Sequence, residues 1–296
     1  MTIALATASW AGALDDDMAP LVAALHDIGR RAEVVVWDDA AVSWERFELV
    51  VVRSTWDYVA RRSQFLEWAE HVATVTVLAN SPHVLRWSTD KHYLAELAAA
   101  GVAVTPTSFI EPGDDGGAIT GVIAGRLADG EIVVKPAVSA GSADTNRYGP
   151  ADHAVALDHA AGLLAQGRSV MVQPYLDAVD VHGETALVHI AGRFSHAIRK
   201  APILAGRTEL VEGHFASETI SAREPSDAER ALADHALSVV PGQAEHLLYA
   251  RIDLIPGPSG APLVLEMELA EPSMFLAHAP GSAERFAAAI AARIDR

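Results

Sequence analysis

Length, composition and charge already limit what this chain can be. Its 296 residues, half of them hydrophobic, exceed what one simple core usually needs, so two or three subdomains are expected. A net charge of −17 argues against nucleic acid or a membrane as a partner, and no apolar run approaches the roughly 18 to 20 residues that span a bilayer. The absence of cysteine excludes disulfides, thiol catalysis and zinc–thiolate sites, and with a first strand where a signal peptide would begin it predicts a cytoplasmic protein.

The first eighty residues alternate β-rich runs with helical ones. Strands are predicted at 3–8, 33–37, 49–52 and 76–78, and helices at 16–29 and 63–72. This alternation predicts a parallel, doubly wound α/β sheet. Asp15 or Asp16 would cap the first helix and Gly29 would end it. No Gly-x-Gly-x-x-Gly follows the first strand, so dinucleotide binding in the usual manner is unsupported.

A polar and aromatic segment, Arg53-Ser-Thr-Trp-Asp-Tyr58, follows the third strand at its carboxyl end, where open α/β sheets bind ligands. Arg53 could hold a substrate carboxylate, with Trp56 and Tyr58 as apolar walls. The alternative is a structural turn whose aromatic rings cover the edge of the sheet. Both interpretations fit the residues.

Lysine is rare in this chain, which otherwise uses arginine: the three lysines are Lys91, Lys135 and Lys200. Lys91 is predicted in the first turn of a helix over 88–100, where a cation opposes the helix dipole unless both face an anion; a solvated helix lysine is the alternative. Lys135 ends a predicted strand over 131–135. Each is a candidate for anion binding.

The middle of the chain contains two candidate ligand-binding segments. Ser139-Ala-Gly-Ser142, which includes Gly141, is small and flexible enough to wrap a phosphate with backbone N–H groups, although no Walker A sequence is present. Gln173-Pro-Tyr-Leu176 is either a hinge whose backbone binds a flat heterocycle or simply a linker. The surrounding elements are predicted as a strand at 102–110, a loop at 111–117, a helix at 151–166 and a strand at 169–172.

A hairpin is predicted from strands around residues 182–189 and 193–200, with a turn at Ala191-Gly192. Arg199 and Lys200 at its end could neutralise phosphate. The His182, Glu184 and His189 spacing does not favour zinc. Further elements are predicted as a polar segment over 205–224, read as a mobile loop, and helices at 226–240 and 282–294.

The stretch from Tyr249 to Ser273 predicts a second hairpin, broken by a Pro/Gly turn at 256–260. If Asp253 pairs with Glu266, then Glu268 lies opposite Arg251 and three carboxylates share one face; a one-residue slip would remove Asp253 from it. Converging carboxylates repel, so a hard cation such as Mg²⁺ or Mn²⁺ is expected among them. The alternative is an acidic strand face exposed to solvent.

The order of these features resembles the ATP-grasp superfamily, the carboxylate–amine ligases with a glutathione-synthetase-like nucleotide site. The resemblance covers roughly residues 80–280. It implies an ATP-grasp fold, α/β with an α+β C-terminal part, divided into an N-terminal α/β domain at 1–80, a central subdomain at 81–176 and a C-terminal subdomain at 177–296.

The resemblance also implies roles for individual residues. ATP would be bound by Lys91, Lys135, Ser139, Gly141, Ser142, Gln173, Tyr175, Leu176 and Asp180. Asp253, Glu266 and Glu268 would hold Mg²⁺, although many members carry Asn at the third position. Catalytic charge neutralisation would come from Lys135, Arg199, Lys200 and Arg251, and substrate contacts from Arg53, Trp56, Tyr58, Arg199, Glu271 and Ser273.

In that family ATP phosphorylates a carboxylate, and a nitrogen nucleophile attacks the acyl phosphate. The Arg53–Tyr58 segment and Glu268–Leu276 are similar to a compact bacterial subgroup that closes O-ureido-D-serine to D-cycloserine, an amino-acid-like substrate. The alternatives are an intermolecular amino-acid or peptide ligase, a kinase-like phosphotransferase, and a non-catalytic nucleotide-binding module. A homo-oligomer is compatible with any of these.

Overall fold

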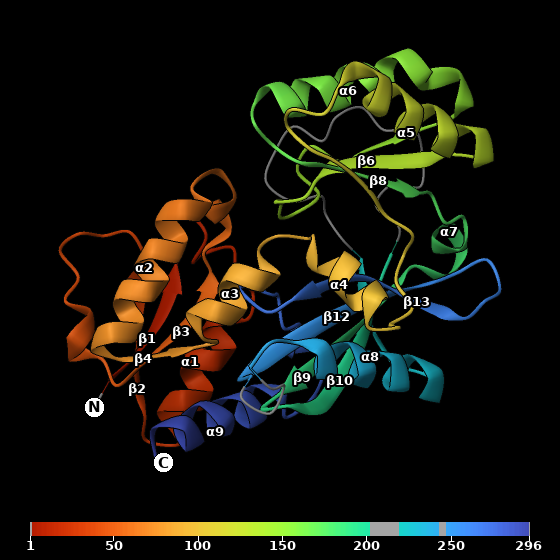
Figure 1. Cartoon of the computed structure of the whole chain (residues 1–296). Coiled ribbons are helices and arrows are strands. Elements are labelled where there is room, and N and C mark those ends of the chain that lie inside the picture. Colours follow the sequence, from red (N-terminus) through yellow and green to blue (C-terminus); the bar gives the residue numbers. More distant parts are fainter. Residues whose placement is uncertain (1, 202–218, 243–246, 296) are drawn as a thin grey trace.

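The computed structural model describes residues 2–201, 219–242 and 247–295, which form three β-sheets (Figure 1). The first sheet is parallel, with the order β2-β1-β3-β4. Its strands are β1 (Thr2–Thr7), β2 (Arg31–Val36), β3 (Leu49–Ser54) and β4 (Val77–Ala79). The predicted parallel sheet is therefore confirmed, because each strand is separated from the next by a helical or looped crossover.

Helices cover both faces of this sheet (Figure 1). On one face α1 (Met18–Asp27) packs beside the last helix of the chain, α9 (Ser282–Ile294), and on the other lies α2 (Arg62–Val75). Helix α1 ends before Gly29, whose φ of +76° suits glycine. The predicted cap was wrong: Asp17 is the N-cap residue, and Asp15 instead accepts a hydrogen bond from the backbone N–H of Asp17 (3.1 Å).

Two short helices, α3 (Pro82–Ser88) and α4 (Tyr93–Ala99), lead from the first sheet to the rest of the chain. The predicted helix over 88–100 is thus too long at its start, and Lys91 lies in the turn before α4 rather than in its first turn. The backbone N–H of Lys91 donates to the carbonyl of Ala137 (3.0 Å), so a tertiary contact holds this turn open.

The second sheet has the order β5-β8-β6-β7, with antiparallel neighbours. Its strands are β5 (Ser108–Ile110), β6 (Ile132–Pro136), β7 (Asn146–Tyr148) and β8 (Val170–Pro174), and α5 (Gly116–Asp129) and α6 (His153–Ala165) cover one face (Figure 1). Only the last three residues of the strand predicted over 102–110 belong to the sheet.

Helix α5 and strand β7 were not predicted. Glycines at positions 116, 117, 121 and 125 occupy α5, and each lowers helix propensity by roughly 1 kcal/mol relative to alanine. Two features compensate: Asp115 caps the helix by accepting from the N–H of Ala118 (2.8 Å), and Ile123 and Leu127 are buried against the sheet. Tertiary packing therefore overrides local propensity here.

The third sheet is antiparallel, with the order β11-β10-β9-β12-β13. Its strands are β9 (Glu184–Ile190), β10 (Arg193–Lys200), β11 (Ile220–Arg223), β12 (Tyr249–Pro256) and β13 (Pro262–Glu268). Both predicted hairpins are present. The loop predicted over 205–224 lies mostly outside the described residues, and its last part forms β11.

One face of the third sheet is covered by α4 and by α8 (Asp227–Val239). Ile252 and Leu254 of β12 point into this apolar layer, so the residues that alternate with them, Arg251 and Asp253, point to the opposite face. That opposite face looks toward the second sheet, which the short helix α7 (Ala178–His182) follows in the chain (Figure 1).

Buried polar side chains join the first sheet to the third. The amide of Asn80 donates to the carbonyls of Tyr249 (3.0 Å) and Leu269 (2.8 Å) and accepts from the N–H of Leu248 (2.7 Å). The hydroxyl of Tyr249 on β12 lies 3.0 Å from the carbonyl of Val52 on β3 and 2.7 Å from that of Ala270, which follows β13. The segment that follows β13 is therefore held in a fixed place against the first sheet.

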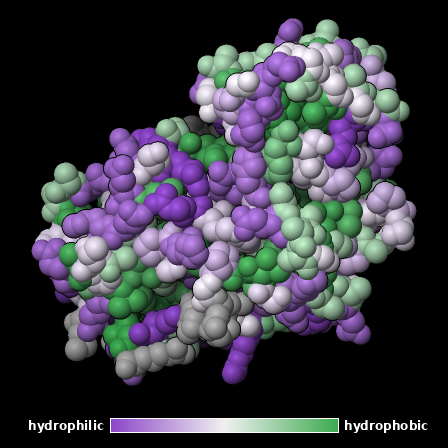
Figure 2. Space-filling view, in the orientation of Figure 1, coloured by the Kyte–Doolittle hydropathy of each residue, from purple (hydrophilic) through white to green (hydrophobic). Residues whose placement is uncertain are grey.

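The surface seen in Figure 2 mixes hydrophilic and hydrophobic residues, and the lobe built on the second sheet projects from the rest of the molecule. None of the helices in the described part of the chain is long and apolar enough to cross a membrane. The predicted boundaries at residues 80 and 176 stay a prediction, since α3 and α4 pack on the third sheet and α9 on the first.

Candidate active site

A cavity of about 500 Å³ lies between the second and third sheets, and residues of the first sheet's loops close one end of it. It brings together most of the residues singled out in the sequence. Those that line it are Trp56, Tyr58, Lys91, Lys135, Ser139, Gly141, Ser142, Gln173, Tyr175, Leu176, Lys200, Arg251, Asp253, Glu266, Glu268, Glu271 and Ser273.

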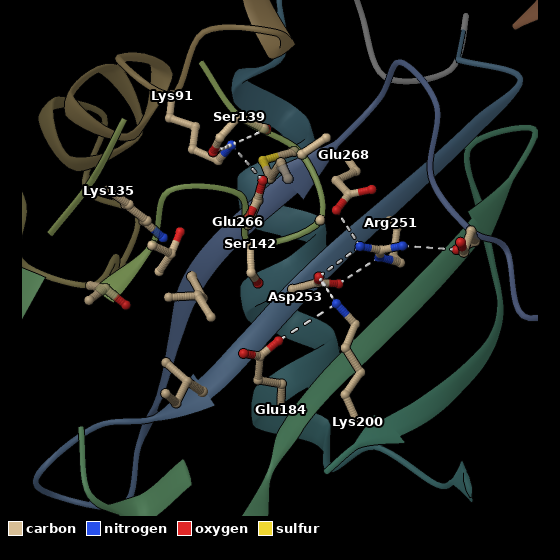
Figure 3. A pocket seen from close by; sticks show the side chains of 18 of the residues that line it. Lys91, Lys135, Ser139, Ser142, Glu184, Lys200, Arg251, Asp253, Glu266 and Glu268 are labelled. Atoms are coloured by element: carbon tan, nitrogen blue, oxygen red, sulfur yellow. Dashed lines mark hydrogen bonds and ion pairs between the residues drawn. The ribbon is translucent and has the colours of Figure 1, made fainter. Parts of the chain in front are cut away.

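The β12–β13 hairpin supplies the acidic floor of the cavity (Figure 3). Its register pairs Asp253 with Glu266 and Arg251 with Glu268, as predicted. Paired residues of an antiparallel ladder share a face, so all four side chains point into the cavity. The alternative of a solvent-exposed acidic strand is wrong, because Asp253 is 2% exposed.

Asp253 is neutralised by two cations (Figure 3). The Lys200 ammonium lies 2.5 Å from its Oδ2, and Arg251 donates through Nε and Nη2 at 2.9 and 3.0 Å. Burial alone would raise the pKa of Asp253, but Arg251 and Lys200 outweigh it and hold that pKa below its ordinary value. Asp253 is therefore an anion at neutral pH.

Glu266 is approached by lysines from the other side (Figure 3). The Lys91 ammonium lies 3.0 Å from Glu266 and donates to the carbonyl (2.8 Å) and the hydroxyl (3.1 Å) of Ser139. Burial opposes ionisation of Glu266, yet Lys91 and Lys135 hold its pKa below the usual range. Lys91 thus connects the small-residue loop to the acidic hairpin.

Lys135 differs from the other two lysines. It is 8% exposed, and its ammonium makes no hydrogen bond or ion pair with any residue that the structure describes. Burial lowers the pKa of Lys135, and only the more distant Glu266 and Glu184 oppose that effect. A buried ammonium that faces a cavity without a partner is suited to binding an anion.

Two further carboxyl groups are held partly in their neutral form by their surroundings. Burial raises the pKa of Glu268 to about 7, with Glu266 and Asp253 adding to the rise and Arg251 opposing it, although Arg251 donates directly to Glu268. Burial raises the pKa of Glu271 to about 8, with the charge of Glu268 adding to the rise. A positively charged ligand near Glu268 and Glu271 would lower both pKa values.

The donor set fits Mg²⁺ better than a softer metal, because it consists of carboxylate oxygens. No three acidic or histidine side chains in the described ranges are close enough to form a metal cage by themselves. Mg²⁺ is usually held by one or two carboxylates together with substrate phosphates, and Glu266 and Glu268 on one strand face meet that need.

Arg53 lies apart from this group. It is 1% exposed and does not line the cavity. Its Nη2 lies 3.5 Å from a carboxylate oxygen of Asp15 and of Asp17, so buried acids already occupy the cation that was expected to hold a substrate carboxylate. The position of Arg53 therefore favours the structural interpretation of this arginine, whereas Trp56 and Tyr58 of the same segment line the cavity.

Arg199 and Asp180 also lie outside the cavity lining. Successive residues of a strand point to opposite faces, so only one of Arg199 and Lys200 can point inward, and it is Lys200. Arg199 instead donates to the carbonyls of Val181 (2.7 Å) and His182. Asp180 accepts from the hydroxyl of Tyr175 and lies 3.6 Å from Arg147.

The segment Gln173–Leu176 forms the wall opposite the hairpin. The Gln173 amide donates to Thr107 (2.9 Å), and the N–H of Tyr175 donates to the carbonyl of Glu131 (2.7 Å). The Arg147 guanidinium carbon lies 3.5 Å from the centre of the Tyr175 ring. These contacts fix the strand end, as a hinge that binds a flat ring would require.

Comparison with known proteins identifies the family to which this chain belongs. Residues 3–80 match the family model described as "D-cycloserine synthetase DcsG, N-terminal domain". Over 99% of its length the chain is 40% identical to the cycloserine biosynthesis protein DcsG of Streptomyces lavendulae, of which it covers 98%. The chain belongs to the DcsG family of ATP-grasp ligases.

Solved structures agree with this membership of the DcsG family. The crystal structure of D-cycloserine synthetase DcsG superposes with a TM-score of 0.89 at 40% identity, covering 99% of this chain and 100% of that one. The ATP-grasp ligase PsnB, in complex with a minimal precursor, gives a TM-score of 0.65 at 19% identity and 99% coverage of both chains. D-Alanine–D-alanine ligase from Bacillus anthracis gives 0.70 at 13%, covering 100% of this chain and 98% of that one. The predicted ATP-grasp fold is confirmed.

Sequence reasoning missed cavity residues in this DcsG-family chain. Glu184 lines the cavity, opposite Lys200 in the β9–β10 ladder, with its carboxylate 3.6 Å from that ammonium. A regular ladder starting from the turn at Ala191-Gly192 would pair Glu184 with Arg199. The irregularity between Phe194 and His196 moves the pairing by one residue, so that Glu184 pairs with Lys200. Apolar residues of the lining, among them Val133, Ile255 and Leu265, carry no sequence signal that distinguishes them from core residues.

Proposed function

We propose that this protein uses ATP to close O-ureido-D-serine to D-cycloserine. Support comes first from the family, whose relative carries the name D-cycloserine synthetase. The structural observation that carries the proposal is that Lys91 and Lys135, the acidic β12–β13 hairpin and Arg251 meet in one cavity. Phosphate donor and carboxylate acceptor can therefore lie side by side, as phosphoryl transfer requires.

On the nucleotide side, Lys135 and Lys91 would bind the phosphates. Lys135 has no described partner to give up, and Lys91 would exchange its bond to Glu266 for one to phosphate. The Ser139–Ser142 loop would add backbone N–H groups, helped by left-handed conformations at Gly141 (φ +61°) and Ser142 (φ +60°). The adenine ring would lie against Gln173–Leu176, near Ile255 and Leu265.

Glu266 and Glu268 would hold Mg²⁺, for which Mn²⁺ is an alternative, and Asp253 would join them if it released Lys200 or Arg251. The ion would neutralise charge on the transferring phosphoryl group. Arg251 donates to Asp253, to Glu268 and to the carbonyl of Ser273 (3.1 Å). If Mg²⁺ took over the two acids, Arg251 would be released to orient the substrate carboxylate toward the phosphates.

The reaction needs protein residues only to position the two substrates and to neutralise the charge of the phosphates. The substrate carboxylate takes the γ-phosphoryl group and ADP leaves. The ureido nitrogen bound to oxygen then attacks the acyl carbon, phosphate leaves, and a proton is lost from nitrogen as the five-membered ring closes. Hydrolysis of the carbamoyl group, which consumes one water molecule, releases carbon dioxide and ammonia and gives D-cycloserine. Closure of the cavity around the bound ligands would keep other water from the acyl phosphate.

The test is ADP release with O-ureido-D-serine as the sole amino-acid substrate, with the product identified by mass spectrometry. We expect ADP and D-cycloserine in equal amounts. An intermolecular ligase, which the same geometry would serve, releases ADP only when a second amino acid or peptide is added. That dependence would contradict the proposal, as would a stable phosphorylated product, and ATP binding without turnover would indicate a nucleotide-binding module.

A further inference from the structure

Two of the buried ionisable side chains that line the cavity lack a charged partner among the described residues. Asp253 pairs with Lys200 and Arg251, Glu266 pairs with Lys91, and Glu268 accepts from Arg251. The two buried groups without a direct described partner are an ammonium, Lys135, and a carboxyl, Glu271. The first suits the phosphates. The second is a carboxyl group with a raised pKa, which a nearby cationic ligand would ionise and bind.

Glu271 lines the cavity, is 7% exposed, and makes no side-chain hydrogen bond or ion pair with any residue in the described ranges. Its carboxyl group therefore faces the cavity, where a ligand could supply the partner that no described side chain provides.

Side chains of the first and third sheets hold the backbone around Glu271 in place. The indole N–H of Trp56 donates to the carbonyl of Glu271 (3.3 Å), and the hydroxyl of Tyr249 holds the preceding carbonyl, that of Ala270 (2.7 Å). The aromatic side chains of Trp56 and Tyr58 line the cavity at the same end. Water is therefore partly excluded there, which strengthens any ionic contact, and the Trp56 ring adds a surface that attracts cations.

We propose that Glu271 binds the α-ammonium group of the amino-acid substrate. This inference rests on the proposed function, since it assumes an amino acid whose carboxylate is phosphorylated. One carbon separates the ammonium from that carboxylate, so the ammonium site must adjoin Arg251 and the metal-binding acids. Glu271 meets this requirement, because it follows Glu268 by three residues and lies within electrostatic range of both Glu268 and Arg251.

Another carboxylate offers a comparison. Asp16 also lines the cavity, but its side chain is exposed at the rim. An exposed carboxylate contributes little to ion pairing, because water screens its charge. Ammonium selectivity should therefore depend on Glu271 and hardly at all on Asp16.

The experiment is a cycle of two ligands and three proteins. O-Ureido-D-serine and its analogue with hydrogen in place of the α-amino group are titrated calorimetrically into the wild type, Glu271→Gln and Asp16→Asn, each with saturating Mg-ADP. We expect the wild type to bind the amino compound about 100-fold more tightly than the analogue. Glu271→Gln should lose most of this preference by weakening the amino compound alone, and Asp16→Asn should keep it.

Equal weakening of both ligands by Glu271→Gln would overturn the inference, because it would mean a structural role or a metal-binding one. Loss of the preference in Asp16→Asn instead, or a wild type that does not distinguish the two ligands, would overturn it as well. The wild-type ADP-release assay is independent: if ligands bind with the expected preference but no ADP forms, ring closure fails and the assignment of Glu271 stands. Glu284→Gln, the same change at an exposed position of α9, controls for the substitution.

Discussion

At the scale of single residues, the three lysines of this chain separate into two kinds. Lys200 is part of a buried ion pair with Asp253, and Lys91 has Ser139 and Glu266 as partners. Lys135 is buried without such a partner. Residues that look alike in the sequence therefore have different energetic roles, and the difference can be measured.

Lys135→Met and Lys200→Met should have opposite effects on stability. Lys135→Met removes an uncompensated buried charge, so the free energy of unfolding should stay equal or rise, whereas ATP binding should weaken at least about tenfold. Lys200→Met leaves Asp253 with one cation fewer and should destabilise the protein by about 3–5 kcal/mol. Urea unfolding and nucleotide titration measure both. A Lys135→Met protein that is less stable and binds ATP normally would contradict the assignment.

Glu271 gives the stability a pH dependence. Its pKa of about 8 in the folded protein lies above the ordinary 4.5, so the stability it contributes is complete below about pH 4.5 and is lost as the pH rises through 8. The unliganded wild type should therefore unfold more easily at pH 9 than at pH 6. Glu271→Gln should reduce this difference, leaving the part that comes from Glu268. Identical pH profiles for the two proteins would contradict the environment described for Glu271.

At the scale of elements, the start of helix α1 holds the segment that follows the β12–β13 hairpin in place through hydrogen bonds. Asp17 accepts hydrogen bonds from the backbone N–H groups of Met274 (2.5 Å), Phe275 (3.1 Å) and Leu276 (2.7 Å). Arg53 lies 3.5 Å from the same carboxylate. The arginine first considered as a substrate ligand thus supports a clamp on Phe275, which lines the cavity.

Asp17→Asn should loosen that clamp, because an amide accepts fewer strong bonds than a carboxylate. We expect kcat/KM for the amino-acid substrate to fall about 10- to 100-fold with little change in the KM for ATP, and a loss of about 1–3 kcal/mol in stability. Asp27→Asn on the exposed end of the same helix is the matched control. A destabilised Asp17→Asn enzyme with unchanged substrate kinetics would show that the contact is only structural.

The pairing of Asp253 with Glu266 was predicted as the register that gathers the carboxylates on one face, and it is present although the ladder shifts by one residue between Asp253 and Leu254. The β9–β10 pairing could not be predicted, because an irregularity near Ser195 changes which residue faces Glu184. Alternation excludes that Arg199 and Lys200 both point into one cavity, although both were predicted to neutralise phosphate. The burial of Arg53 depends on Asp15 and Asp17, whose approach requires the complete tertiary fold.

The three acids lie on one face as predicted, but basic side chains reduce the repulsion among them. Sequence reasoning placed Asp253, Glu266 and Glu268 on one face, but lysine and arginine already neutralise much of their charge in the structure. Removing Glu266 should therefore leave Lys91 with an unpaired charge, and no gain in stability is expected from that change. The partners come from elements far apart in the chain, which no local pattern reveals.

At the scale of the whole molecule, the cavity depends on all three sheets. The second sheet contributes Lys135 and Gln173, the third contributes the acids, and the loops of the first contribute Trp56 and Tyr58. Asn80 and Tyr249 join the first sheet to the third through contacts with backbone carbonyls. Nucleotide and substrate sites are consequently parts of one structure, as ring closure from an acyl phosphate requires.

The most direct test of the account is a crystal structure with Mn²⁺ and an unreactive ATP analogue, with the metal located by its anomalous scattering. The account predicts a peak bound by oxygens of Glu266 and Glu268 and by the nucleotide phosphates, with the Lys135 ammonium on those phosphates. A nucleotide bound outside this cavity, or a manganese peak with no contact to either glutamate, would contradict it.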